Sequence, residues 1–155
     1  MAIYTASSVS TIVTASANAV LFGFRASTAR RCFIREIGFF YRTAPTTSGQ
    51  LGLQRSTALG TGAITAVVGQ AHEPGEPAAI GQVETAWATA APTTANLYMK
   101  RFGSAPTIGN GMVWRFDEGS GLVVPLGSAA TGEIVVCNLV ATAPGTMDFW
   151  FTWEE

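Results

Sequence analysis

Short apolar and polar runs alternate along most of this chain, and Gly, Pro, Asn and Ser interrupt them about every 8–12 residues. This pattern is typical of short β-strands joined by turns. No window of about 11 residues or more shows the period of an amphipathic helix. The sequence therefore predicts an all-β fold of about nine or ten short strands, arranged as an antiparallel β-sandwich or a barrel.

Two of the runs define the expected core. Residues 32–42 carry large apolar side chains at both alternating sets of positions, including Phe39 and Phe40, which predicts a central strand covered on both faces. Residues 147–153 alternate more cleanly. A slip of one residue would expose four large side chains, so we expect this last strand to hold its register firmly and to complete the core. These side chains are Met147, Phe149, Phe151 and Trp153.

Length and turn signals place the other elements. The 155 residues fit a single domain, 1–155. Residues 9–14 are the candidate first strand, and residues 1–18 are also considered as an extended N-terminal arm. Residues 117–121 are rich in turn formers, which predicts that residues 122–126 fold back on residues 112–116 as a hairpin.

The composition favours a protein that contacts neighbouring subunits. Hydrophobic residues make up 48% of the chain and charged residues 12%, whereas typical globular domains have about 25% charged residues. Small uncharged residues must therefore cover much of the surface, and such a surface loses little when it is buried against other subunits. We expect a homo-oligomer, and a monomer with a plain Ala/Thr surface is the alternative.

Two classes of partner do not fit the sequence. The net charge of −1 argues against general nucleic-acid binding. The uncharged stretch 1–24 is interrupted throughout by Ser, Thr and Asn, so we expect no membrane span, and no basic segment precedes it as in a signal peptide. We therefore expect a chain made in the cytoplasm without processing.

The charges are unevenly distributed. Residues 1–56 hold six arginines and one acid, Glu36, whereas residues 57–155 hold three basic and nine acidic residues. Either the two parts interleave in one sandwich and pair internally, or the basic part contacts an acidic partner surface. The arginines are Arg25, Arg30, Arg31, Arg35, Arg42 and Arg55.

Residues that could perform chemistry are few and scattered. His72 is the single histidine, and its loop offers Glu73 and Glu76 but no second metal ligand of the usual kind, so we expect an exposed loop residue. Cys32 and Cys137 lie in apolar runs and are expected to be free buried thiols, with a bridge as the alternative if their strands face each other. No nucleophile elbow or phosphate loop is present. We expect no catalytic residue, metal or cofactor.

The four tryptophans are the remaining candidates. Trp114 and Trp153 fall on apolar faces of their strands, so we expect them in the core. Trp87 lies amid Ala and Thr, and Trp150 lies on the polar face of the last strand. These two rings are the better candidates for an interface anchor or for stacking on a sugar.

Several short segments are spread over most of the chain: Ile34-Arg35-Glu36-Ile37, Leu51-Gly52-Leu53-Gln54-Arg55, Gly60-Thr61-Gly62, Trp87, Gly109-Asn110-Gly111, Trp114, Leu122-Val123-Val124-Pro125, Asn138 and Phe149–Trp153. Together they resemble the small jelly-roll decoration (cement) proteins of tailed-phage capsids. The resemblance implies a jelly-roll homotrimer on the virion surface, assembled in the host cytoplasm, which holds neighbouring major capsid subunits together. It carries no catalytic residues.

The expected function is therefore that of a non-enzymatic capsid decoration protein that stabilises the phage head. The alternative is a carbohydrate- or receptor-binding jelly-roll module of a phage tail or fibre. The candidate interface residues are Arg25, Arg30, Arg31, Arg42, Arg55, Trp87 and Trp150.

Overall fold

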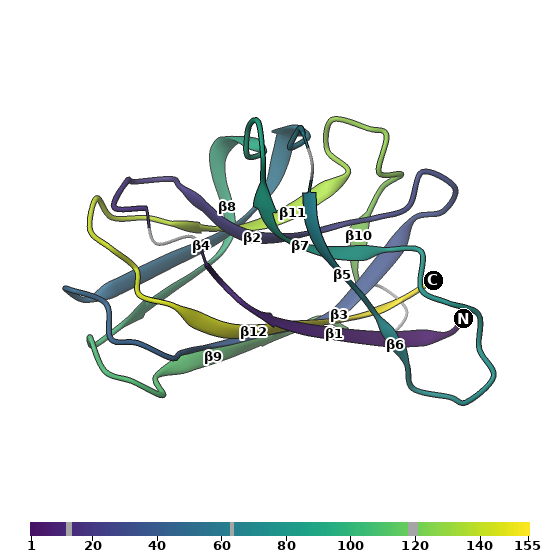
Figure 1. Cartoon of the computed structure of the whole chain (residues 1–155), viewed down its shortest axis with the longest axis horizontal. Coiled ribbons are helices and arrows are strands. Elements are labelled where there is room, and N and C mark those ends of the chain that lie inside the picture. Colours follow the sequence, from purple (N-terminus) through teal and green to yellow (C-terminus); the bar gives the residue numbers. More distant parts are fainter. Residues whose placement is uncertain (12–13, 63, 118–120) are drawn as a thin grey trace.

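In the computed structural model, the chain forms two antiparallel β-sheets that lie one above the other (Figure 1). The structure describes residues 1–11, 14–62, 64–117 and 121–155. Within these residues the strands are β1 (Ile3–Val9), β2 (Val20–Arg25), β3 (Cys32–Tyr41), β4 (Gly49–Ala58), β5 (Ile64–Val68), β6 (Gln70–Ala71), β7 (Gln82–Trp87), β8 (Thr93–Ser104), β9 (Gly111–Arg115), β10 (Leu122–Val124), β11 (Glu133–Asn138) and β12 (Met147–Glu154). The expected all-β sandwich is confirmed, and the described residues form no helix.

The order of the strands is that of a jelly roll. Sheet A has the order β10-β3-β12-β1-β6, with β9 also paired to β3, and sheet B has the order β5-β7-β2-β11-β4-β8. Successive strands β1 to β4 alternate between the sheets, and the first strand, β1, pairs with the last, β12. This connectivity is that of the double-sheet jelly roll. Strands β5, β6 and β7 are an addition between β4 and β8 that widens both sheets.

The core between the sheets is rich in aromatic rings. Phe22 of β2 stacks on Phe149 of β12 across the sandwich, with ring centroids 4.0 Å apart and planes at 8°. Phe24 contacts Trp153, with centroids 4.8 Å apart. All four apolar side chains predicted to face inward from β12 are at most 1% exposed, and Trp114 is also buried. The predicted register of the last strand is confirmed.

Within strand β3, the alternation of inward-facing and outward-facing side chains shifts by one residue. Ile34 and Ile37 both point into the core although they are three residues apart. The cause is a β-bulge, since Arg35 has no partner in the otherwise continuous pairing with β12. The strand is central, as predicted, but its outer face is not covered: Phe40 is 38% exposed. The bulge, which no period-two pattern describes, turns Arg35 and Glu36 together to that outer face.

Residues 112–126 do not form the predicted hairpin. Strands β9 and β10 both pair antiparallel with β3, β9 along residues 36–40 and β10 along residues 32–34. They therefore follow each other along one edge of β3. Both strands run antiparallel to β3 and therefore in the same direction as each other, which a hairpin does not allow. Of that predicted turn, residues 118–120 lie outside the described residues.

The N-terminal segment is not an arm over Ile3–Val9. These residues form β1, which lies between β12 and β6 and pairs with β12 along its whole length. Tyr4 and Ala6 face the core at 2% and 4% exposure. The segment was missed because Ala, Ser and Thr make its alternation weak. Of the first strand predicted at 9–14, only Val9, which ends β1, lies in a strand among the described residues. Residues 10, 11 and 14 are not in a strand, and residues 12 and 13 lie outside the described part.

Candidate functional site

The β3 bulge shapes an open groove on the outer face of sheet A. Arg35 and Glu36 turn outward there, beside Arg115 of β9 and Glu154 of β12. The groove has a volume of about 410 Å³. Its lining residues are Ile3, Arg35, Glu36, His72, Arg115, Phe116, Thr152 and Glu154. We call it the outer groove.

An aromatic pair borders the outer groove. Trp150 of β12 and Phe40 of β3 lie on the same outer face, with ring centroids 5.7 Å apart and an angle of 21° between their planes. The Trp150 indole lies against Gly38 of β3, where a Cβ atom would come within 2.0 Å of Cζ2. The missing side chain at Gly38 is therefore what admits the ring. Trp150 remains only half-buried.

Glu36 links the aromatic pair to the outer groove through hydrogen bonds to Trp150 and Arg115. Its Oε1 accepts the indole N–H of Trp150 at 2.8 Å, and its Oε2 accepts a hydrogen bond from Nε of Arg115 at 3.0 Å. The hydrogen bond from Trp150 is the main cause that lowers the pKa of Glu36; burial opposes it and Arg115 adds to it. Glu36 is thus a carboxylate of fixed orientation at neutral pH.

The second carboxylate of the groove belongs to an ion pair. Nη2 of Arg35 contacts Oε1 of Glu154, and the two side chains are 16% and 10% exposed. Nη1 of Arg35 also donates to the backbone oxygen of Asp117 at 3.0 Å. Nε of Arg35 and Oε2 of Glu154 are buried without a hydrogen-bond partner among the described residues. The ion pair therefore retains unused hydrogen-bonding capacity.

His72 closes the groove from the loop after β6. As predicted, it is an exposed loop residue. Its Nε2 lies 2.7 Å from Oγ1 of Thr5, which in turn lies 2.9 Å from Oγ1 of Thr152. This chain of polar contacts crosses β1 and β12 and fixes both the imidazole and the Thr152 hydroxyl at the groove wall.

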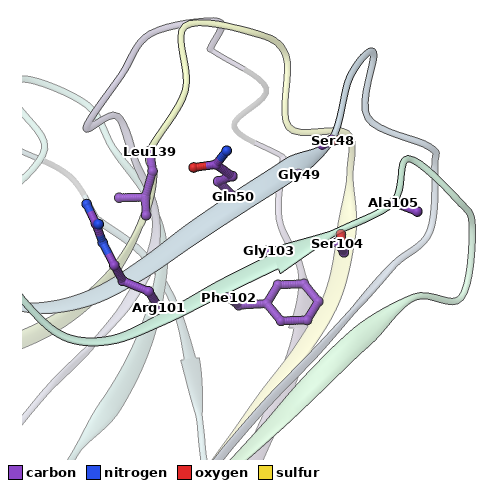
Figure 2. A pocket seen from close by; sticks show the side chains of 9 residues that line it. All are labelled: Ser48, Gly49, Gln50, Arg101, Phe102, Gly103, Ser104, Ala105 and Leu139. Carbon is purple, nitrogen blue, oxygen red and sulfur yellow. The ribbon is translucent and has the colours of Figure 1, made fainter.

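A second hollow lies at the paired ends of β4 and β8 (Figure 2). It has a volume of about 460 Å³ and is lined by Ser48, Gly49, Gln50, Arg101, Phe102, Gly103, Ser104, Ala105 and Leu139. Figure 2 shows Gln50 and Arg101 projecting away from the ring of Phe102, which is itself buried. Arg101 is the single charged residue of this lining. Small side chains and backbone give this hollow fewer fixed polar groups than the outer groove.

Arg25 and Trp87 belong to a closed polar network on sheet B. Arg25 pairs with Glu84, at 2.9 Å between Nε and Oε1, and with Glu133. Glu84 also accepts the indole N–H of Trp87 at 2.7 Å, and Glu133 accepts the backbone N–H of Gly60 at 3.0 Å. Burial raises the pKa of Glu84. Every carboxylate oxygen in this network has a partner within the chain, so the polar groups of Arg25 and Trp87 are engaged in internal contacts.

The other predicted interface arginines do not gather in one place. Arg30 and Arg31 are exposed in the loop between β2 and β3, and neither forms an ion pair with a described residue. Arg42 is exposed at the opposite end of β3, 3.7 Å from Asp148. Arg55 is half-buried, and burial lowers its pKa. Of the predicted interface residues, the structure places Trp150 alone beside the outer groove.

The uneven charges of the sequence largely cancel within the fold. Each described ion pair that involves an arginine of residues 1–56 reaches an acid of residues 57–155, and Glu36 pairs with Arg115 in the opposite sense. The two parts of the sequence interleave in the sandwich. Of the two explanations considered for the uneven charges, these contacts support pairing within the chain.

The two cysteines are free and buried, as predicted. Burial raises the pKa of Cys32 to about 12 and that of Cys137 to about 11. Both side chains therefore remain thiols at neutral pH, and a thiol is a poor nucleophile. Within the described residues, no group of three or more His, Cys, Asp or Glu side chains could hold a metal ion.

Most residues of the outer groove carried no signal in the sequence. The polar face of residues 147–153 pointed to Trp150. In contrast, Arg35 and Glu36 share a face because of a bulge, and Arg115 reaches Glu36 because β9 pairs with β3. Both relationships are tertiary, so spacing along the chain does not reveal them.

Comparison with known families, curated proteins and solved structures finds no match for this chain. Among the described residues there is no helix with the length and apolar character needed to cross a bilayer.

Proposed function

We propose that this chain is a non-enzymatic structural subunit that decorates a phage head, binding the major capsid protein as a homotrimer. The observation that carries the proposal is the free edge of sheet B. Strand β8, twelve residues long, ends this sheet and pairs with β4 alone among the described strands. It exposes 77% of Leu97 and 38% of Met99, and apolar side chains at an edge favour contact with another chain.

The same edge is protected against simple strand addition. The pairing of β4 with β8 has three register shifts, and Asn96 adopts a positive φ of 60°. Lys100 and Arg101 add charge to the strand. Bulges and cations of this kind oppose open-ended extension of a sheet. The contact we propose is therefore made by side chains and not by a continued hydrogen-bond ladder.

The opposite edge of sheet B supports a ring of subunits. Strand β5 exposes 55% of Val68 and carries no charged residue. Two different edges on one subunit permit head-to-tail contacts, which close into a ring when the rotation between subunits fits. The low charged fraction of 12% lowers the cost of burying such surfaces.

Attachment to heads tests this function. Purified protein is mixed with phage heads that lack it, and occupancy is measured by co-sedimentation. We expect saturable binding, and we expect charge reversal of both Arg30 and Arg31 to weaken it, since these exposed cations form no ion pair with any described residue. Circular dichroism verifies that the variant folds. Wild-type protein that stays in the supernatant contradicts the function, and unchanged occupancy of the variant contradicts the role of the arginines.

A further inference from the structure

We propose that the outer groove and the adjoining Trp150 ring form a binding site for a neutral saccharide, with one pyranose ring stacked on the indole and its hydroxyls in the groove. This inference goes beyond the decoration role. It concerns sheet A, whereas the assembly contacts proposed above use the edges of sheet B.

The indole supplies a stacking surface that is already in place. Gly38 lies beneath it, Phe40 lies beside it at 5.7 Å between centroids, and its N–H is bound to Glu36. The ring is half-buried, so part of its surface meets solvent. A pyranose presents a face of C–H groups that packs on such a ring. Because the contacts of Trp150 restrict its rotation, little side-chain freedom is lost when a ligand binds.

The charge balance of the groove selects a neutral, hydroxyl-rich ligand. Two guanidinium groups, of Arg35 and Arg115, face two carboxylates, of Glu36 and Glu154, within the same lining. The four charges cancel, so an anion such as phosphate gains little net attraction. A sugar hydroxyl both donates and accepts a hydrogen bond, and it can therefore bridge a carboxylate and a neighbouring guanidinium.

Unused donors and acceptors lie where such hydroxyls would bind. The side chain of Arg115 is 83% exposed and donates its Nε hydrogen to Glu36. Its other N–H groups have no partner among the described residues and face solvent, where a ligand can reach them. Nε of Arg35 and Oε2 of Glu154 also have no partner among the described residues, but both atoms are buried, so they are not among the groups open to a ligand. His72 and Thr152 add an imidazole and a hydroxyl to the same lining. The groove volume of about 410 Å³ is within the range of small-molecule sites.

The two carboxylates bind and do not cleave in this arrangement. Glycoside hydrolysis needs one carboxyl group that stays protonated until it donates to the leaving oxygen. The pKa of Glu36 is lowered and Glu154 is paired with Arg35. Neither carboxyl therefore has the environment of a general acid, and the site fits recognition of a sugar without its hydrolysis.

The test uses the full chain and defined probes. Glucose, galactose, mannose, N-acetylglucosamine and their short oligomers are titrated, and the indole N–H signals are followed by NMR. We expect at least one probe to shift the Trp150 signal. Trp150→Ala and Arg115→Ala should each weaken its binding by about tenfold or more. Trp87→Ala is the matched control, since Trp87 is also half-buried and also donates its N–H to a glutamate.

Three results would overturn the site. They are no binding by any probe up to about 10 mM, well above a Kd of about 1 mM, unchanged affinity in both Trp150→Ala and Arg115→Ala, and signal shifts confined to Trp87. Arg115 is exposed, so its variant remains informative even if Trp150→Ala does not fold. Head attachment of the same variants is measured separately and should be unchanged, so failure of the sugar site and failure of the decoration role give different results.

Discussion

The indole of Trp150 packs against Gly38 on the neighbouring strand so closely that a methyl group at Gly38 would come within 2.0 Å of Cζ2. This contact holds the ring on the outer face of sheet A, from which its N–H reaches Glu36 at 2.8 Å. A backbone position without a side chain thereby fixes a tryptophan and, through it, a carboxylate. The orientation of the Glu36 carboxylate in the outer groove therefore depends on the contact between Trp150 and Gly38.

Replacing Gly38 by alanine should displace the indole. We expect Gly38→Ala to lower the free energy of unfolding by about 1–3 kcal/mol, the usual cost of forcing a methyl group into a packed contact, and to shift the tryptophan fluorescence. Urea unfolding and emission spectra measure both effects. Gly103→Ala in β8 is the control, since among the described residues, its two chain neighbours aside, no atom lies within 4 Å of a Cβ atom at that position. Equal behaviour of the two variants would contradict the packing role of Gly38.

Glu36 should titrate below the ordinary glutamate pKa of about 4.3, because Trp150 and Arg115 stabilise its charged form. A folded-state pKa below the unfolded value stabilises the protein above about pH 4.3, and this stability is lost as the pH falls through the folded-state pKa. NMR of the Glu36 carboxyl carbon gives the midpoint. In Trp150→Phe, which removes the N–H, the midpoint should rise. The same midpoint in both proteins would show that the indole bond has no effect.

Glu84 should make the free energy of unfolding depend on pH in the opposite sense to Glu36. Burial raises its pKa in the folded protein, so its contribution to the free energy of unfolding falls as the pH rises from about 4.3 towards the folded-state pKa. Urea unfolding at a series of pH values measures this slope. We expect Glu84→Gln to remove that component and Glu73→Gln, an exposed loop acid, to leave it in place. An unchanged slope in Glu84→Gln would assign the pH dependence to other groups.

Substitution of two phenylalanines should distinguish the buried core from the exposed outer face of sheet A. Phe151 is 0% exposed and Phe40 is 38% exposed. We expect Phe151→Ala to cost about 3–5 kcal/mol of unfolding free energy, whereas Phe40→Ala should cost less than about 1 kcal/mol, as for most surface substitutions. Urea denaturation measures both. A comparable loss at Phe40 would mean that the outer face of sheet A is itself a covered core.

The sequence predicts the elements of this fold whose residues repeat with period two over several large side chains. Residues 147–153 are the clearest example, since a wrong register would expose Phe149, Phe151 and Trp153 together. Strand β1 was missed because Ala, Ser and Thr give little contrast between buried and exposed positions. The expected hairpin at 112–126 failed because turn residues show that the chain bends without showing where it goes afterwards.

The outer groove was beyond prediction for a related reason. The bulge at Arg35 reverses the alternation of β3 in mid-strand, and a bulge has no fixed sequence pattern. The pairing of Glu36 with Arg115, 79 residues further along the chain, follows from the sheet topology. Trp150 was identified because the polar face of its own strand is a local property.

Assembly through exposed edges is tested most directly by the mass of the purified protein in solution, measured by light scattering. We expect a mass close to three times that of the 16.2 kDa chain, and we expect Leu97→Asp in β8 to shift it towards the monomer while circular dichroism stays unchanged. A wild-type protein that remains a monomer across the concentration range would contradict the proposed trimer and the role of the β8 edge.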